Sequence, residues 1–364
     1  MKIVPIDLNE RSYNIHIGSG SLDDAGLIIA EACKGKKAAV VTNPAIGKLY
    51  GERMMCTLEK AGVSAKIICV PAGERFKTLR TISGLYEKLL DDKIDRSCTA
   101  IGLGGGIVGD MTGFAAATWL RGIDFIQVPT SLLAQVDASV GGKTGVNLSR
   151  GKNLVGSFHQ PRAVIIDVSV LDTLPPREFR SGLAEVVKHG IIRDRNYFEY
   201  IENNLNAIIR LDPAALEHIV SVSCAIKADV VQQDERESGL RRILNYGHTA
   251  AHAVERLTSY RKYKHGEAVA IGMVTASCAA EVIRGYDTGM TDRIVNLLRA
   301  IGLPYRCPSN IDHNDVLEAM GLDKKVSHGR LNAVLSNEIG TAYVDNNVSH
   351  DQWLSALDRQ SRLR

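Results

Sequence analysis

The sequence predicts an α/β domain with a mostly parallel, Rossmann-like sheet, followed by an all-α domain. Two observations carry this prediction. In the first half of the chain, short continuous apolar runs alternate with segments of helical periodicity, which is typical of strands covered on both faces. In the second half, long helical patterns follow one another and strand-like runs are few. The 364 residues, 45% of them hydrophobic, are enough for two domains with full cores.

The expected strands are short apolar runs that end in polar or glycine-containing loops. They are 38–42, 66–70, 99–103, 125–128 and 164–167. Helical periodicity follows at 180–192, 211–235 and 247–257. The apolar stretch 268–283 is interrupted by Glu281 and is too short to cross a bilayer, so it indicates a buried helix.

The two domains are expected to meet at Pro175–Pro176. A residue before proline is driven out of the α region, so a double proline is a plausible boundary between two patterns. We therefore expect an α/β domain at 1–175 and a helical domain at 176–364.

The composition excludes several classes of protein. A net charge of only +3 gives no reason to expect a nucleic-acid partner. The seven cysteines are odd in number, widely spaced and without a Cys-x-x-Cys pair, so we expect reduced thiols in a cytoplasmic protein. The first 18 residues lack the apolar core of a signal peptide, and no membrane partner is expected.

A glycine-rich loop at 104–110 follows an expected strand and opens a helical segment. Gly104, Gly106 and Gly109 satisfy G-x-G-x-x-G, and the backbone N–H groups of such a loop can hold a pyrophosphate at a helix N-terminus. The loop does not follow the first strand, however. Asp124 precedes its strand and is a poor ribose ligand. A tight turn without a ligand therefore stays an alternative.

Histidines and one glutamate in the second half suggest a metal site. His248 and His252 are four residues apart and share a helix face, His265 lies a short loop away, and Glu185 lies on an earlier helix. Imidazoles with one carboxylate suit Zn²⁺ with an open position. Thr249 stands where the H-E-x-x-H proteases need glutamate, which argues against a metalloprotease. Packed or surface histidines are the alternative.

Basic side chains among glycines and hydroxyl residues could bind a small substrate that carries phosphate and carboxylate groups. Solvated surface charge is the alternative for each of them. The segment around Lys143 is not a P-loop, because Asp137 stands where that motif needs glycine. The candidates are Arg121, Lys143, Lys152, Asn153, Lys188, Lys227, Arg241, Lys324 and Lys325.

These motifs, taken in order, resemble the 3-dehydroquinate synthase family over nearly the whole chain. The matching segments are 104–110, 121–144, 151–161, 173–178, 182–188, 244–252, 265–273 and 323–325. The resemblance implies an NAD-dependent lyase of the shikimate pathway that also needs Zn²⁺ or Co²⁺. It would convert 3-deoxy-D-arabino-heptulosonate 7-phosphate to 3-dehydroquinate and phosphate by oxidation, elimination, reduction and aldol cyclisation. The first domain would bind NAD, and the helical domain would bind metal and substrate.

The resemblance also implies a role for each matching residue. The metal ligands would be Glu185, His248 and His265, with His252 a catalytic group rather than the ligand that spacing alone suggests. The NAD contacts would be Asn43, Gly73, Glu74, Lys77, Gly105, Gly106, Asp110, Thr130, Ser131, Lys143, Lys152, Thr173, Leu174 and Glu178. The substrate contacts would be Asp137, Lys143, Asn153, Lys188, Lys227, Arg241, Asn245 and His252. Arg121 would reach the phosphate bound by the neighbouring subunit of a homodimer.

Three other functions compete with this one. A sister sugar-phosphate cyclase, such as an amino-dehydroquinate, 2-deoxy-scyllo-inosose or valiolone-type synthase, would share the fold, NAD and metal. An iron-type polyol dehydrogenase would share the architecture and release NADH, but the segments around Lys143 and Lys152 argue against it. A sugar-phosphate sensor without activity would have lost ligands or lysines, whereas every implied ligand is present.

Overall fold

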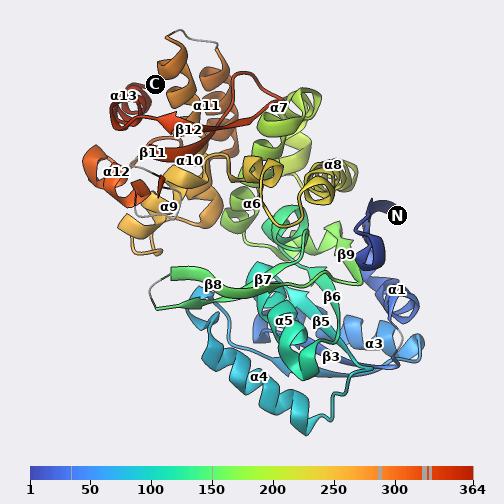
Figure 1. Ribbon diagram of the computed structural model, residues 1–364. Helices are drawn as coiled ribbons and strands as arrows, with labels where there is room; N and C mark the ends of the chain where they lie inside the picture. Colours follow the sequence, from blue (N-terminus) through green and yellow to red (C-terminus); the bar gives the residue numbers. More distant parts are fainter. Residues whose placement is uncertain (34, 150, 286–288, 322–325, 328–329, 364) are drawn as a thin grey trace. The chain divides into compact units, whose positions relative to one another are not determined.

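The computed structural model describes residues 1–33, 35–149, 151–285, 289–321, 326–327 and 330–363. The chain divides into two compact units (Figure 1). The first unit comprises Met1–Leu174 and Pro213–Arg236, and the second comprises Pro175–Asp212 and Glu237–Arg364. Each unit is described by itself below.

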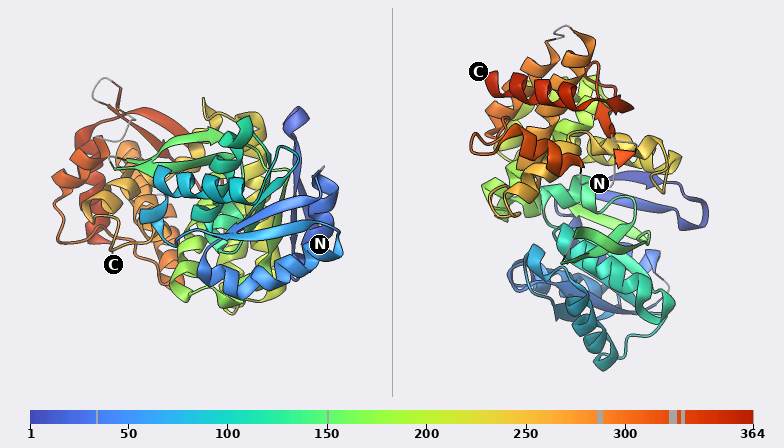
Figure 2. Two further views of the ribbon diagram at one scale, coloured as in Figure 1. Left: turned by 90° about the horizontal axis from the view of Figure 1, so that it is seen from below. Right: turned by 60° about the vertical axis from the view of Figure 1, so that its left-hand side comes forward.

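The first unit is built on a seven-stranded sheet with the order β1-β2-β9-β6-β5-β3-β4. The strands are β1 Lys2–Ile6, β2 Tyr13–Gly18, β3 Lys37–Thr42, β4 Ser64–Cys69, β5 Thr99–Gly104, β6 Asp124–Pro129 and β9 Ala163–Asp167. All neighbouring pairs are parallel except β1 with β2. The expected parallel sheet is confirmed. The β1–β2 hairpin, dark blue in Figure 2, was not predicted, because β1 is largely exposed and its apolar pattern is weak.

Helices cover both faces of this sheet. One face packs against α1 (Ala25–Ala32) and α3 (Glu52–Lys60), and the other packs against α4 (Leu79–Asp91) and α5 (Gly106–Thr118). Successive strand residues point to opposite faces, so Val40 belongs to the first core and Val41 to the second. This double burial explains why the strands are continuously apolar.

The helix α8 (Pro213–Gln233) belongs to the first unit, whereas the sequence analysis predicted a helical domain at 176–364. It packs against β1, β2 and the π-helical turn η6 (Ala134–Ala138). Periodicity identified this helix correctly, but periodicity does not tell which apolar surface a helix covers.

An antiparallel pair, β7 (Lys143–Leu148) and β8 (Gly151–Phe158), forms a separate two-stranded sheet in the first unit. Both strands pack against α5. The pair contains the Gly-Lys segments that the sequence marked as candidate anion sites.

The second unit is mostly helical, as expected. Its helices are α6 Pro176–Arg193, α7 Arg195–Ile209, α9 His248–Leu257, α10 His265–Arg284, α11 Met290–Ile301, α12 His313–Gly321 and α13 His350–Arg362. The central helix α10 packs against α6, α9, α11 and α13. It is long and apolar enough to cross a membrane, but 83% of its apolar window is buried inside the unit, as in a core helix. The expected buried helix at 268–283 is therefore confirmed.

The second unit also contains a three-stranded antiparallel sheet, where the sequence had indicated helices alone. Its strands are β10 Val326–Ser327, β11 Arg330–Leu335 and β12 Tyr343–Val348. β12 reads YVDNNV, and its mix of polar and apolar residues is a weak strand signal.

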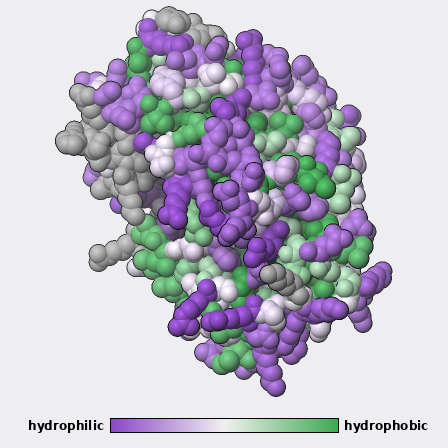
Figure 3. Space-filling model, turned by 45° about the vertical axis from the view of Figure 1, so that its right-hand side comes forward, coloured by the Kyte–Doolittle hydropathy of each residue, from purple (hydrophilic) through white to green (hydrophobic). Residues whose placement is uncertain are grey.

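The surface is ordinary for a globular protein. On the face shown in Figure 3, hydrophilic side chains predominate and hydrophobic ones lie in small groups between them. The large hydrophobic residues that are exposed, such as Leu27, Leu90 and Leu154, are spread along the chain. Scattered exposure of this kind needs no functional explanation.

Candidate active site

Three side chains from three helices of the second unit converge on one point. Glu185 lies on α6, His248 begins α9 and His265 begins α10. Nε2 of His248 lies 3.7 Å from Oε1 of Glu185, and Nε2 of His265 lies 3.6 Å from the same oxygen. One ligand atom from each residue lies within 4.8 Å of the others. Residues that are 80 positions apart in the sequence therefore share one centre.

Glycines allow these helices to approach closely enough. A Cβ at Gly266 would lie 1.8 Å from the carbonyl oxygen of Ser181 on α6. A Cβ at Gly272 would lie 1.9 Å from the carbonyl oxygen of Gly247, which itself has a φ of +79°. Glycine is required at such contacts, because any side chain would push the backbones apart. The glycines of the sequence motifs thus bring the first residues of α9 and α10 to Glu185.

The second nitrogen of each imidazole faces an acceptor. Nδ1 of His248 lies 3.2 Å from the carbonyl oxygen of Tyr246, and Nδ1 of His265 lies 3.5 Å from Oε1 of Glu255. A proton on Nδ1 leaves the lone pair of Nε2 directed at the shared centre, which is the usual arrangement of metal-binding histidines. Glu255 was not predicted as a site residue from the sequence. Its signal was its position on α9, seven residues after His248 and therefore on the same face.

The donor set fits a divalent metal ion. Ligand atoms about 2.1 Å from a tetrahedral Zn²⁺ lie about 3.4 Å apart, close to the two separations found at Glu185. Oε1 of Glu185 is buried and accepts no hydrogen bond within the described residues. Buried carboxylate oxygens are normally satisfied, so this one is available to a cation.

A buried lysine balances the charge of this centre. Lys188, three residues after Glu185 on α6, forms an ion pair with it. Burial raises the pKa of Glu185, but Lys188 and the two imidazoles outweigh burial and hold that pKa well below its usual range. Burial lowers the pKa of His265, but the carboxylates of Glu185 and Glu255 raise it to about 10. Burial lowers the pKa of His248 well below its usual value.

His252 lies beside the three converging residues and is not one of them. Its ring meets the His248 ring edge-on, with 5.6 Å between the centroids. Spacing placed both histidines on one face of α9, and the structure confirms that placement. The group of Glu185, His248 and His265 excludes His252 as a close ligand.

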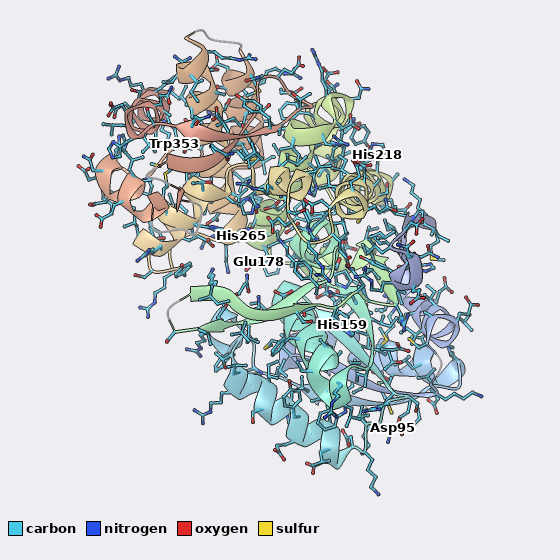
Figure 4. All side chains as sticks on the ribbon, viewed as in Figure 1. Asp95, His159, Glu178, His218, His265 and Trp353 are labelled. Atoms are coloured by element: carbon cyan, nitrogen blue, oxygen red, sulfur yellow. The ribbon has the colours of Figure 1, made fainter. Side chains whose placement is uncertain are left out.

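The remaining candidates of the second unit lie on α6 and just before α9. Arg241 is buried in η8 (Leu240–Asn245), and Asn245 donates a hydrogen bond of 2.5 Å to Glu237. Glu178 is in the first turn of α6 and pairs with Lys264 at 2.6 Å. Figure 4 labels Glu178 and His265, which begin neighbouring helices of this unit.

In the first unit, candidate NAD residues gather at one edge of the sheet. Asn43 follows β3, Glu74 follows β4, and Gly105 follows β5. Thr130 and Ser131 follow β6, and Thr173 with Leu174 end the segment after β9. The chain leaves β3 toward β4 and returns on the other side of β3 as β5, which makes this point a topological switch. Ligands of open α/β sheets bind at such a point, beyond the carboxyl ends of the strands.

The glycine loop between β5 and α5 is shaped by close contacts. A Cβ at Gly109 would lie 2.3 Å from Oε1 of Gln127, and one at Gly106 would lie 3.0 Å from Cβ of Ala138. Gly105 is the N-cap of the 13-residue helix α5, whose first N–H groups have no intrahelical acceptor. A pyrophosphate fits such a helix start. Asp124 begins β6, at the opposite end of the strand, and pairs with Arg162 at 2.8 Å, in agreement with its exclusion as a ribose ligand.

Lys77 joins the glycine-loop helix to the β7–β8 pair. Its buried ammonium contacts Asp110 on α5 and donates a hydrogen bond of 2.5 Å to Oδ1 of Asn153. Burial raises the pKa of Asp110, and Lys77 opposes that rise. Gly73 has a φ of +108°, in the left-handed region that favours glycine, where the chain turns toward Glu74. Two expected NAD residues and one expected substrate residue are thus in direct contact.

The anion candidates of the first unit differ in exposure. Lys227 on α8 donates hydrogen bonds of 2.5 Å to both Oδ1 and the carbonyl oxygen of Asp137. Lys143 is exposed at the start of β7, and Lys152 is half-buried near the start of β8. Arg121 is exposed and has a φ of +68°. The segment 323–325 lies outside the described residues.

The chain matches one known family along most of its length. Residues 67–181 match the model of the N-terminal part of 3-dehydroquinate synthase, and residues 182–326 match that of the C-terminal part. The chain is 49% identical to the 3-dehydroquinate synthase of Nostoc punctiforme over 96% of this chain and 97% of that protein. It is 46% identical to that of Desulforamulus reducens over 99% of this chain and 100% of that protein.

Solved structures show the same fold. A 2-deoxy-scyllo-inosose synthase complexed with carbaglucose-6-phosphate, NAD⁺ and Co²⁺ aligns with a TM-score of 0.89 at 27% identity, covering 99% of this chain and 100% of that one. The 2-epi-5-epi-valiolone synthase of Streptomyces hygroscopicus, with NAD⁺ and Zn²⁺ bound, aligns with a TM-score of 0.88 at 26% identity, covering 98% of each chain. Both family models and the full-length relatives name the same enzyme. The chain therefore belongs to the 3-dehydroquinate synthase family.

Proposed function

We propose that this chain converts 3-deoxy-D-arabino-heptulosonate 7-phosphate to 3-dehydroquinate and phosphate. The reaction combines oxidation, phosphate elimination, reduction and intramolecular aldol cyclisation. The observation that carries the proposal is the convergence of Glu185, His248 and His265 in a chain that is 49% identical to full-length 3-dehydroquinate synthases. The enzyme depends on NAD and on a divalent ion such as Zn²⁺ or Co²⁺.

The substrate assignment rests on the degree of similarity. The 2-deoxy-scyllo-inosose and valiolone synthases share the fold at only 26–27% identity. The 3-dehydroquinate synthases are far more similar over the same length. Lys143, Arg241 and Asn245 further favour a substrate that carries a carboxylate. The two cationic side chains attract an anion, and the amide of Asn245 can donate a hydrogen bond to it.

In the second unit, Glu185, His248 and His265 would hold the metal ion. When bound, the ion supplies Lewis acidity at the substrate hydroxyls and NAD supplies a hydride acceptor that is regenerated within each cycle. His252 lies beside these ligands and would move a proton at the substrate, since an imidazole ring can both accept and donate a proton. Lys188 forms an ion pair that keeps Glu185 ionised, and it would also contact the substrate.

The first unit would hold the nucleotide and part of the substrate. The loop of Gly105 and Gly106 would bind the pyrophosphate, and Glu74 would accept hydrogen bonds from the ribose. The other proposed NAD contacts are Asn43, Gly73, Lys77, Asp110, Thr130, Ser131, Lys143, Lys152, Thr173 and Leu174, with Glu178 from the second unit.

The substrate would be oriented by charged and amide side chains that hold its phosphate and carboxylate. They are Asp137, Lys143, Asn153, Lys188, Lys227, Arg241, Asn245 and His252. Lys227 and Asp137 would act together, because the ammonium is already bound to the carboxylate in the structure. Such a pair presents a fixed donor without adding net charge.

The proposal extends to assembly and location. Arg121 would reach the phosphate at the neighbouring subunit of a homodimer, and its exposure supports that role. The seven free cysteines, all within the described residues, support a reducing compartment such as the cytoplasm.

The test is a phosphate-release assay with 3-deoxy-D-arabino-heptulosonate 7-phosphate and NAD, with the organic product identified by mass spectrometry. We expect 3-dehydroquinate and phosphate in equal amounts, no net NADH, loss of activity with a chelator, and recovery with Zn²⁺ or Co²⁺. Turnover of the amino analogue alone would assign the chain to the amino-dehydroquinate synthases. NADH accumulation with glycerol would indicate a polyol dehydrogenase, and binding without turnover would indicate a sensor.

A further inference from the structure

The β7–β8 pair contains a bulge at Asn147. Val146 pairs with Val155 and Leu148 pairs with Gly151, and the register shifts between them. Asn147 instead forms a parallel bridge with Thr78, and its backbone N–H donates to the carbonyl oxygen of Lys77 at 2.8 Å. A bulge redirects one side chain out of the regular ladder. Here it directs Asn147 toward the segment that contains Glu74.

The amide of Asn147 is used at both ends. Its Nδ2 donates a hydrogen bond of 2.6 Å to Oε1 of Glu74. Its Oδ1 accepts a hydrogen bond of 2.9 Å from the backbone N–H of Asn153. A donor and an acceptor on one short side chain are needed for this bridge, and among side chains of this size only asparagine has both in an amide plane.

Asn153 is held in an unusual conformation by these contacts. Its φ is +52°, in the left-handed region that asparagine adopts more readily than most other non-glycine residues. Asn147 holds its backbone, and Lys77 holds its side-chain oxygen at 2.5 Å. Asn153 is therefore held from two sides, by Asn147 of β7 and by Lys77 of the segment that contains Glu74.

We infer that Asn147 is a positioning residue that links the nucleotide side of the site to the substrate side. The inference rests on the proposed function, in which Glu74 binds the NAD ribose and Asn153 binds the substrate. Through its amide, Asn147 fixes the Glu74 carboxylate and the Asn153 backbone in one arrangement. Its loss would weaken both binding events, although its side chain need not touch either molecule.

The first experiment compares Asn147→Ala with Asn14→Ala. Asn14 is an exposed residue on β2, near the opposite edge of the sheet from β4. A hydrogen bond to a charged group is worth about a factor of ten or more in binding. We expect Asn147→Ala to raise both the dissociation constant of NAD, measured by calorimetry, and the KM of the heptulosonate phosphate about tenfold. We expect kcat to change less than threefold, and Asn14→Ala to change none of the three.

A second experiment separates positioning from general stabilisation of the β7–β8 pair. In Asn147→Asp two carboxylates would face each other, so binding should weaken more than in Asn147→Ala. Adding Glu74→Gln restores a hydrogen bond between the two side chains in the opposite direction. The amide introduced at position 74 now donates to the carboxylate introduced at position 147. In the double variant the substrate KM at saturating NAD should return to within threefold of that of Glu74→Gln alone. NAD binding should stay weak, because the ribose carboxylate is gone.

A positioning role predicts both results together: in the double variant the substrate KM recovers, and the NAD affinity does not. Unchanged NAD affinity and KM in a folded Asn147→Ala would overturn the inference, as would a double variant no better than Asn147→Asp. A wild-type enzyme that releases no phosphate from the substrate would refute the proposed function instead. The two failures are therefore distinguishable.

Discussion

Lys188 and Glu185 form an ion pair one turn apart on α6, with both side chains withdrawn from solvent, at 1% and 0% exposure. Removing one partner of a buried pair leaves an uncompensated charge, which costs about 3–5 kcal/mol. We expect Lys188→Met to lower the free energy of unfolding of the metal-free protein by that order. Because a divalent ion can replace the missing positive charge, Zn²⁺ should restore much of the loss.

The measurement is urea denaturation with chelator and with Zn²⁺. A matched control is Arg195→Met on α7, which breaks the exposed pair of Arg195 with Glu199. Exposed helix pairs contribute only about 0.3–0.5 kcal/mol, so this variant should stay near the wild type and show no rescue by metal. Equal destabilisation of the two variants would contradict the assigned role of Lys188.

Glu255 faces the second nitrogen of His265 at 3.5 Å, and we predict that it sets the orientation of that ring. Partners of this kind typically change metal affinity 10–100-fold when they are lost. Glu255→Gln should weaken Zn²⁺ binding by about that factor in a competition assay with a chromogenic chelator. Glu318→Gln, at an exposed position on α12, should leave the affinity unchanged. Equal Zn²⁺ affinities in all three proteins would remove Glu255 from the site.

His265→Ala should abolish metal binding and activity while the fold is kept. His265 begins α10 and is one of three converging side chains, so its loss leaves two ligands, too few for a stable site. Metal content by mass spectrometry and circular dichroism are the two measurements. Full turnover by a metal-free His265→Ala protein would show that this centre is not the metal site.

Lys143→Ala should reduce kcat/KM about 10–100-fold, because a charged hydrogen bond to an anionic substrate is worth roughly 1.5–3 kcal/mol. Lys66→Ala serves as the control in the same unit. Lys66 on β4 is 63% exposed and forms an ion pair with Asp92, which directly follows α4. Steady-state kinetics of phosphate release measure both. A Lys143 variant as active as the Lys66 variant would contradict the anion-binding role.

His159 should make the first unit less stable in mild acid. Its ring (the residue is labelled in Figure 4) stacks on Phe125 with 6.2 Å between centroids. Nε2 of His159 lies 3.0 Å from the carbonyl oxygen of Ile123. Burial lowers the pKa of His159 below that of the unfolded chain. When the pH lies between the pKa of the folded state and that of the unfolded state, His159 binds a proton in the unfolded state but not in the folded state. The stabilising contribution is therefore present above pH 6.5 and is lost as the pH falls, by at most about 1.4 kcal/mol per pH unit.

Chemical denaturation at pH 7.5 and 5.5 tests this sign. His159→Gln keeps a donor for Ile123 but cannot titrate, so its loss of stability between the two pH values should be smaller than that of the wild type. His350→Gln, at a ring that is 65% exposed, should retain the wild-type difference. If His159→Gln lost as much stability between pH 7.5 and 5.5 as the wild type does, His159 would not be the source of the acid sensitivity.

The parallel sheet could be predicted because its central strands are buried on both faces. Runs such as 38–42 and 164–167 are continuously apolar, and the structure places them in β3 and β9. The exposed strands β1 and β8 lack that signal, so neither hairpin was predicted. Pairing partners are tertiary information that the period of a single segment does not contain.

The metal site could be predicted in part. The spacing of His248 and His252 correctly placed them on one face of one helix. Spacing alone could not tell which of the two belongs to the group of possible metal ligands. That choice depends on where α10 packs against α9 and α6, which is set by the backbone contacts of Gly247, Gly266 and Gly272. Asn147 gave no signal at all, because a bulge is visible only once the register of both strands is known.

The helix α8 has a consequence for how the polypeptide matures. The first unit uses residues up to 174 and then residues 213–236, so its last helix is translated after the start of the second unit. During synthesis, β1 and β2 must wait for Pro213–Gln233 before their apolar side is covered. A fragment that stops at Leu174 would leave that surface bare and should aggregate. Each unit therefore consists of two separate segments of the chain, and no single cut in the gene would separate the two units.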